Sequence, residues 1–319
     1  MREALFVKQN HSKWESYEKM DASFPDEVAA RFIEITDDLA YAKTFYPKSK
    51  TTAYLNGLAA RLHQTLYINK KEKANRFKTF WQTELPFIFF QYRKQLGYAL
   101  LFFMAFALIG AFSAAKDDTF VRVILGDQYV DMTNANIERG DPFGVYKSMN
   151  PFTMFFMIAA NNIKVSCIAF LMGILCSVGT VAVLMYNGIM LGSFQYYFFS
   201  KGLGASSVLV IWIHGTLEIS AIVIAGAAGL ILGNSLLFPK TFSRLVSFKQ
   251  GAKDGLKIIV GLVPIFIVAA LLESFVTRHT EMPVWLSAFI LVASLLFIVW
   301  YVVIYPNKLA KTSLYEPKR

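Results

Sequence analysis

The chain has 319 residues, of which 55% are hydrophobic, 15% aromatic and only 17% charged. This composition is far more apolar than that of soluble domains, so it excludes an ordinary soluble protein and predicts an integral membrane protein. The formal net charge of +10 is expected when basic residues gather on one side of a membrane beside anionic headgroups, and we therefore expect no nucleic-acid partner.

Residues 1–96 are predicted to form a cytoplasmic helical region. Charged residues are frequent there, and apolar residues at helical spacing predict helices that begin near Pro25 and Thr51. The aromatic residues of segment 77–95 predict an amphipathic elbow helix in the plane of the membrane interface, with a kink at Pro86.

Four uncharged apolar stretches have the length expected of membrane spans. A helix rises 1.5 Å per residue, so a hydrocarbon core of about 30 Å needs roughly 20 apolar residues. The stretches that reach or approach this length are residues 97–115, 206–232, 258–272 and 284–304.

A fifth uncharged region, residues 165–200, is too long for one straight crossing. It predicts either a tight helical hairpin that turns near Asn187 and Gly188 or a re-entrant element. The hairpin is favoured because it gives six crossings with both termini inside, and asparagine beside glycine suits its turn. The preceding segment, from Asn150 to Lys164, is rich in phenylalanine and methionine. We expect that segment to form an interfacial helix on the outer leaflet.

The distribution of charge predicts the side of the membrane that each connection faces. Basic residues cluster before the first span, in segment 238–255 and in the tail 306–319, whereas acidic residues outnumber basic ones in the connection 116–164. Because basic residues near span ends stay in the cytoplasm, we expect an outer loop at 116–164 and both termini inside the cell. We therefore expect the transmembrane domain, residues 97–305, to be an all-α bundle of about six crossings.

His214 and Glu218 lie one helical turn apart near the middle of the second apolar stretch and share one helix face. Ionisable residues inside a membrane are commonly proton relays or ion ligands. The alternative is a buried polar clamp that fixes the packing of neighbouring helices. A catalytic zinc needs about three protein ligands and this pair supplies two. Glu273, His279 and Glu281 could approach only if Glu218 lay shallow, so we expect no metal or other cofactor.

Three further groups of residues are assigned to packing, to the polar core and to the membrane edge. Small residues at helical spacing let membrane helices approach closely, within the fold or across a dimer interface; they are Gly215, Ala221, Ala225, Gly229 and Gly233. Amides in apolar surroundings indicate hydrogen bonds between helices; they are Asn161, Asn162 and Asn187. The residues predicted to form a solvated outer rim, with a gate or a partner contact as the alternative, are Glu273, Arg278 and His279.

Several of these residues together resemble the signature of a known family. They comprise the string His214, Gly215, Thr216, Leu217 and Glu218 with the small residues after it, Asn161 and Asn162, Asn187 with Gly188 and Gly192, and a set of residues between Tyr54 and Tyr67. The set resembles the stage II sporulation protein M family of integral membrane proteins, in its broader branch. The resemblance implies a polytopic scaffold, which in the sporulation branch holds peptidoglycan-degrading partners during engulfment.

The sequence therefore predicts a multipass membrane protein that is a scaffold or assembly component of a bacterial envelope complex and not an enzyme. One alternative is a transporter or channel subunit in which His214 and Glu218 line a path for a solute or for protons. A weaker alternative is an intramembrane metal-dependent hydrolase. The expected partners are the lipid bilayer, other envelope proteins and further copies of the chain, with a dimer favoured.

Overall fold

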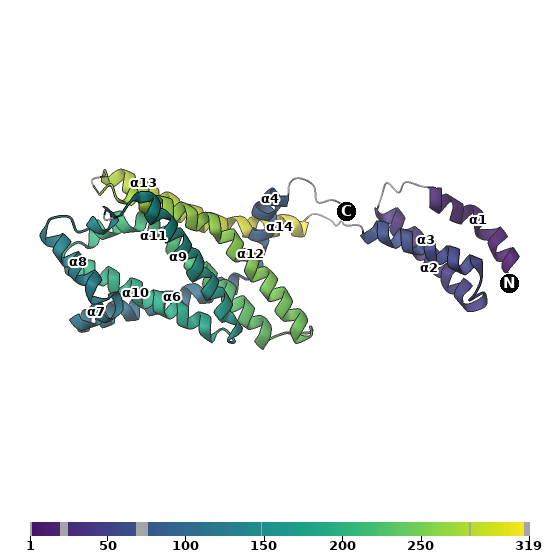
Figure 1. The fold of residues 1–319 in the computed structure, drawn as a ribbon, viewed down its shortest axis with the longest axis horizontal. Helices are drawn as coiled ribbons and strands as arrows, with labels where there is room; N and C mark the ends of the chain where they lie inside the picture. The colour runs from purple at the N-terminus through teal and green to yellow at the C-terminus, as the bar shows by residue number, and fades with distance from the viewer. Residues whose placement is uncertain (1, 20–24, 68–75, 148, 281, 316–319) are drawn as a thin grey trace. The chain divides into compact units, whose positions relative to one another are not determined.

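The computed structural model describes residues 2–19, 25–67, 76–147, 149–280 and 282–315. These residues are mostly helical and none of them lies in a β-strand, which confirms the predicted all-α class. The chain divides into two compact units, Met1–Phe77 and Lys78–Arg319. Figure 1 shows the path of the chain through both.

The first unit is built from three helices around a single core. Trp14 on the first helix is 2% exposed, and its indole Nε1 donates to Asp38 Oδ2 on the second at 2.7 Å. The helices predicted to begin near Pro25 and Thr51 are confirmed, and an additional helix precedes them. The three are α1 (Glu3–Lys19), α2 (Pro25–Phe45) and α3 (Lys50–Tyr67).

The elbow before the first span consists of three short pieces. They are α4 (Arg76–Thr79), the π-helix η1 (Phe80–Glu84) and α5 (Leu85–Gln91). The break predicted at Pro86 comes later, at Tyr92, whose φ of −106° and ψ of 24° leave the helical region. Pro86 is the second residue of α5 and follows η1 directly, and the backbone stays helical there, with Glu84 and Leu85 both in the αR region. Leu85 and Phe89 join the main core of the second unit, so the compact unit begins well before the boundary predicted at residue 96.

Within the described residues, six helical segments are long and apolar enough to cross a membrane, which confirms the predicted number of crossings. They are α6 (Arg93–Lys116); α9 (Pro151–Leu171) with η3 (Met172–Ile174); α10 (Val178–Ser200); α11 (Gly204–Leu237); α12 (Arg244–Leu271) with the π-helix η4 (Leu272–Thr277); and α13 (Val284–Val299) with η5 (Trp300–Ile304) and α14 (Tyr305–Tyr315).

The predicted hairpin exists as α9 and α10, but its turn is not at Asn187 and Gly188. The chain reverses where Cys176 and Ser177 adopt positive φ values of 51° and 69°. Asn187 and Gly188 lie inside α10. The predicted turn position is therefore wrong by about ten residues.

Both residues of the misplaced turn serve helix structure and packing instead. The Asn187 amide donates to Val183 O in the preceding turn of α10 at 2.8 Å. Gly188 faces α6 so closely that a Cβ there would lie 2.8 Å from Phe103 O. A local asparagine–glycine pattern cannot reveal such a contact, because the opposing helix lies far away in the sequence.

The interfacial helix predicted between Asn150 and Lys164 is also corrected. The Asn150 side chain caps α9 by accepting from Phe152 N at 3.0 Å, and α9 then runs through the whole segment as part of a span. Asn162 is buried, whereas Asn161 and Lys164 are exposed on the outside of the bundle. A long charged side chain can reach the interface from inside a span, so Lys164 does not end the helix.

The connection between α6 and α9 is folded rather than extended. Its elements are α7 (Asp118–Leu125), α8 (Asp127–Glu138) and the 3-10 helix η2 (Gly144–Lys147). They pack on α10 and α11 through a small core that includes Val121, Val130, Tyr146, Phe198 and Ile211. We call this side of the bundle the loop end, and the opposite side, where α6 begins, the elbow end.

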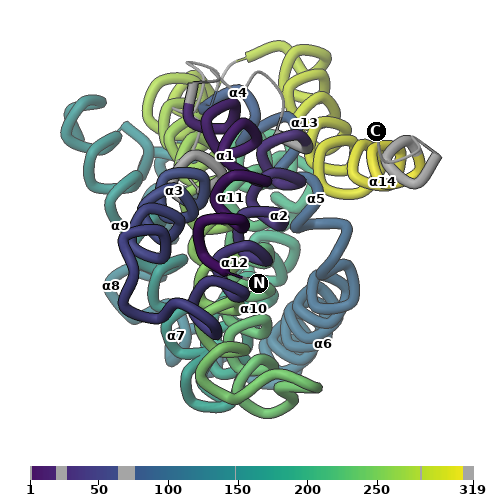
Figure 2. The backbone as a smooth tube through the Cα atoms, turned by 90° about the vertical axis from the view of Figure 1, so that its right-hand side faces the viewer, coloured from purple at the N-terminus to yellow at the C-terminus, as the bar shows by residue number. Residues whose placement is uncertain are grey.

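The long helix α11 lies at the centre of the bundle. It contacts α6, α9, α10, α12 and α13, and Figure 2, which looks approximately along the bundle, shows α6, α9 and α13 on different sides of it. Gly229 lies against Ala169 O and Thr180, and Gly233 against Ser177. Ala221 and Ala225 are fully buried. This stripe of small residues therefore packs within the chain, and the dimer stays a prediction.

Candidate functional site

His214 lies in the loop-end half of α11 and joins that helix to η4. It is ten residues from the start of α11, or about 15 Å at the rise of an α-helix, and is only 4% exposed. Its Nδ1 lies 3.0 Å from Thr277 Oγ1, and its Nε2 lies 3.8 Å from Glu273 Oε2. Both ring nitrogens therefore face the same neighbouring segment.

The structure separates the three residues assigned to an outer rim. Glu273 lies beside His214 with a side chain that is 16% exposed. Arg278 lies at the loop end, where its Nη2 donates to Met149 O at 3.2 Å, and His279 is exposed. Glu281 lies outside the described residues.

An irregular helix turn accounts for the inward position of Glu273. The apolar stretch itself ends at residue 272, and the helix continues beyond it to Thr277 as the π-helix η4. A π-helical turn carries an extra residue and changes the direction of the side chains that follow, and such turns are frequent at functional sites.

Glu218 completes a compact cluster of three titratable side chains. One ligand atom each of His214, Glu218 and Glu273 lies within 4.8 Å of the others. The Asn162 side chain, from α9, lies beside the Glu218 carboxyl. However, the Asn162 Nδ2 makes no hydrogen bond of good geometry, although the residue is only 4% exposed. α9, α11 and η4 thus meet at this cluster.

Tyr146 covers the cluster from the loop end. Its ring centroid lies 5.7 Å from that of His214, with the planes at 70°, and the residue is 8% exposed. Burial first, and then the nearby carboxyl groups of Glu273 and Glu218, raise the pKa of Tyr146 well above its ordinary value. The phenol therefore stays neutral and can serve as a hydrogen-bond donor.

The remaining residues predicted for the polar core lie away from the cluster. Asn161 is exposed on the outer face of α9, and Asn187 bonds within α10.

Gly215, which was assigned to helix packing, is buried, yet a Cβ there would meet no atom within 4 Å. It is therefore not at a close helix contact, and it marks open space one residue from His214.

Sequence reasoning missed Tyr146 and Thr277 and misplaced Glu273. Glu273 was assigned to the rim although it directly follows the apolar stretch 258–272, and an ionisable residue within a span is by default a functional candidate. Neither Tyr146 nor Thr277 carries a local signal, since each meets His214 only through the tertiary fold.

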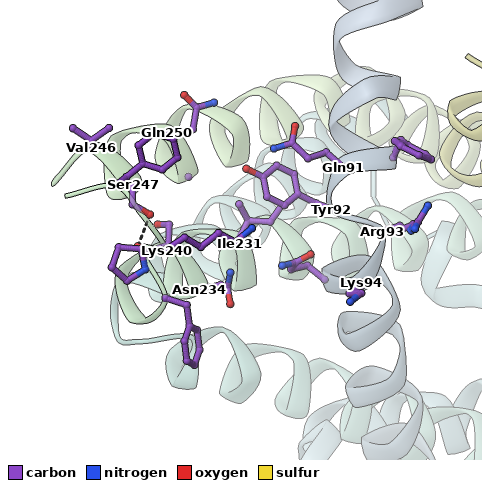
Figure 3. Close-up of a pocket in the computed structure, with 17 residues that line it drawn as sticks. Gln91, Tyr92, Arg93, Lys94, Ile231, Asn234, Lys240, Val246, Ser247 and Gln250 are labelled. Atoms are coloured by element: carbon purple, nitrogen blue, oxygen red, sulfur yellow. Dashed lines mark hydrogen bonds between the residues drawn. The ribbon is translucent and has the colours of Figure 1, made fainter. Parts of the chain in front are cut away.

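A second polar feature, a cavity of about 650 Å³, lies at the elbow end. Figure 3 shows Lys240 extending from the connection between α11 and α12 towards the segment that carries Tyr92 and Lys94. Asp254, which is buried behind the cavity, is held by Tyr92 Oη at 2.7 Å and by Gln250 Nε2 at 3.0 Å. The charged residues that line the cavity are all basic: Arg93, Lys94 and Lys240.

The His214 cluster can act chemically in three ways. Two carboxyl groups and an imidazole can ligate a cation, exchange protons, or form a polar contact that ties three helices together. Among the described residues, the only ion pair of Glu273 is with His214, and Glu218 has none. In the part of the chain that the structure describes, no lysine or arginine compensates the carboxylates directly.

Comparisons with known proteins agree with this architecture. The family described as Stage II sporulation protein M matches residues 99–278, which include His214, Glu218, Glu273 and Asn162. A domain of unknown function (DUF8413) matches residues 4–68, so the residues between Tyr54 and Tyr67 fall outside the first match. Neither a curated protein nor a solved structure matches the chain significantly. Because the first match covers more than half of the chain, this multipass membrane protein belongs to the stage II sporulation protein M family.

Proposed function

We propose that this chain is a scaffold or assembly component of a bacterial envelope complex and catalyses no reaction. The observation that carries the proposal is the close packing of the bundle. A Cβ added at Gly188 would lie 2.8 Å from Phe103 O, and one added at Gly192 would lie 2.8 Å from the carbonyl carbon of Ala107, both on α6. Contacts this close hold helices at a fixed separation, which suits a scaffold better than the rocking of a transporter.

The folded parts outside the spans supply surfaces for partners. The three helices of residues 2–67 and the loop-end helices each expose large apolar side chains. Ile33 on α2 is 61% exposed and Val123 on α7 is 77% exposed. Exposed apolar residues on folded parts outside a membrane support a role in protein contact when they form a patch.

The distribution of charge supports a location in the inner membrane with both termini in the cytoplasm. Basic residues line the elbow-end cavity, and the loop-end connection carries Asp117, Asp118, Asp127 and Asp131. The positive-inside rule then assigns the elbow end to the cytoplasm. A cysteine introduced at Val123 should react with a membrane-impermeant thiol reagent in intact spheroplasts, whereas one introduced at Lys43 should react only after lysis.

A crosslinking experiment tests the scaffold. The tagged full chain is crosslinked in its native cells, purified, and its companions are identified by mass spectrometry. Ile33→Asp and Val123→Asp should each remove a subset of companions, because both place a charge in an apolar contact. Lys43→Asp, which adds the same residue at an exposed polar position of α2, is the matched control. An unchanged set of companions in both test variants would refute the proposal.

The alternative is a transporter or channel subunit, and the cluster of His214, Glu218 and Glu273 is the observation that favours it. In this case Glu218→Gln would abolish a cation or proton flux in proteoliposomes while the protein stayed folded. Under the scaffold proposal, Glu218→Gln leaves the set of companions intact, because the amide keeps the shape and most of the hydrogen-bonding capacity of the carboxyl group.

A further inference from the structure

We propose that His214, Glu218 and Glu273 bind a divalent first-row transition metal ion inside the bundle. This goes beyond the proposed scaffold, for which no metal was expected. The two-ligand objection to a metal no longer holds, because η4 brings Glu273 to the pair as a third ligand.

The distances fit an ion after small side-chain movements. Ligands at about 2.0–2.2 Å from a zinc-like ion lie about 3–3.5 Å from one another. His214 Nε2 and Glu273 Oε2 are already 3.8 Å apart, and no pair among the three ligand atoms exceeds 4.8 Å. Rotation of the flexible Glu218 and Glu273 side chains is enough to close the site, without movement of the helices.

The charge balance also favours a divalent ion. Two carboxylates held together in a membrane repel each other, and burying them unpaired is costly. Among the described residues no lysine or arginine forms an ion pair with either. One divalent cation with two carboxylates and a neutral imidazole has a net charge of zero. A neutral site costs the least free energy to bury inside a membrane.

Groups around the three ligands match what metal sites use as support. When Nδ1–H of His214 donates to Thr277 Oγ1, the lone pair of Nε2 faces Glu273, and such a partner fixes the ring of a ligating histidine. Thr277 is 1% exposed, so the bond is sheltered from water.

Asn162 supplies the independent observation. The residue is 4% exposed, its side chain lies beside Glu218, and its Nδ2 makes no hydrogen bond of good geometry to the described residues. The two ends of an amide differ only in which is donor and which is acceptor. Turned end for end, Asn162 presents Oδ1 as a fourth ligand, and the open space at Gly215 leaves room for a water ligand.

The ligand set selects the class of ion. One imidazole with two carboxylates suits Zn²⁺, Fe²⁺ or Mn²⁺, whereas a set without nitrogen would suit Mg²⁺ or Ca²⁺ and a thiolate set would suit Cu⁺. The site therefore takes a borderline transition ion, which would tie α11 to α12 and, through Asn162, to α9.

The test uses the full chain in lipid nanodiscs, stripped with a chelator, washed, and titrated with Zn²⁺ or Mn²⁺. The wild-type protein should bind roughly one ion per chain by calorimetry and elemental analysis. Glu273→Gln and His214→Ala should weaken metal binding by about a hundredfold or more, because each removes a ligand present in the cluster. Asn162→Leu should weaken it by about tenfold, which is typical of a residue that supports the ligands. His279→Ala should leave binding unchanged, because this exposed histidine is outside the cluster.

Three results would overturn the proposal. They are binding of less than roughly a tenth of an ion per wild-type chain, Glu273→Gln affinity equal to that of the wild type, or binding of Mg²⁺ in preference to Zn²⁺ and Mn²⁺. Glu273→Gln is nearly isosteric, so size-exclusion elution and helical circular dichroism that match the wild type establish that loss of binding is not loss of fold.

Discussion

Replacing Gly188 by leucine tests whether α10 truly packs backbone to backbone against α6. A Cβ at this position would lie 2.8 Å from Phe103 O and 3.0 Å from Phe106 Cβ, whereas ordinary contacts begin at about 3.5 Å. The helices would have to separate, or α6 would have to shift, before any further atom of the new side chain could be placed.

The magnitude follows from comparison with Gly97→Leu. Gly97 is an exposed glycine on α6 with no atom within 4 Å of its Cβ position. Both substitutions gain the same helix propensity, about 0.5–1 kcal/mol, so the difference between them isolates packing. Overpacking costs about 1–3 kcal/mol per site. We expect the cost of Gly188→Leu to lie at the upper end of this range, because the whole leucine side chain would meet backbone atoms of α6. At about 2–4 °C per kcal/mol for a unit of this size, Gly188→Leu should melt about 6–12 °C below Gly97→Leu.

The assay is thermal unfolding of the full chain in one detergent, followed by circular dichroism and by elution after heating. Equal melting temperatures for the two variants would refute the close contact and would return Gly188 to the turn that its sequence context suggests. A loss confined to Gly188→Leu supports a bundle whose spans are held at fixed separations.

Three further predictions concern other parts of the chain. Burial and the hydrogen bond to Asp254 raise the pKa of Tyr92. The neutral phenol therefore stabilises the fold fully below the unfolded-state pKa of about 10, and this stabilisation is lost as the pH rises from there towards the folded-state pKa. Melting temperatures measured against pH should be flat from about pH 7 to 9, fall at higher pH, and fall less in Tyr92→Phe. Trp14→Ala should cost the first unit about 3–5 kcal/mol, because the ring is 2% exposed, and limited proteolysis should then cleave residues 2–67 while the spans stay intact. Vesicles rich in phosphatidylglycerol should raise the melting temperature more than vesicles of phosphatidylcholine do, because Lys94 and Lys240 line the elbow-end cavity and attract anionic headgroups. The double variant Lys94→Gln with Lys240→Gln should remove this difference between the lipids. The same difference in the variant as in the wild type would contradict the prediction.

The membrane spans are the part of the fold that local sequence predicts best. Length and apolarity are properties of each segment alone, so the six crossings follow from composition and from the thickness of a bilayer. The same rule failed where a segment was interrupted by polar residues. Lys164 and Asn162 divided α9 into an interfacial piece and a span, although one of them faces outward and the other is buried.

Apolar segments of span length and helical spacing were enough to predict a helical membrane protein in which His214 and Glu218 share one face of a span. Helical periodicity places residues one turn apart together, whatever surrounds them. The folded bundle is what brings Glu273, Thr277, Asn162 and Tyr146 to this pair. Each of those residues lies more than 50 positions away in the chain, and their meeting depends on a π-helical turn and on which helix faces pack together.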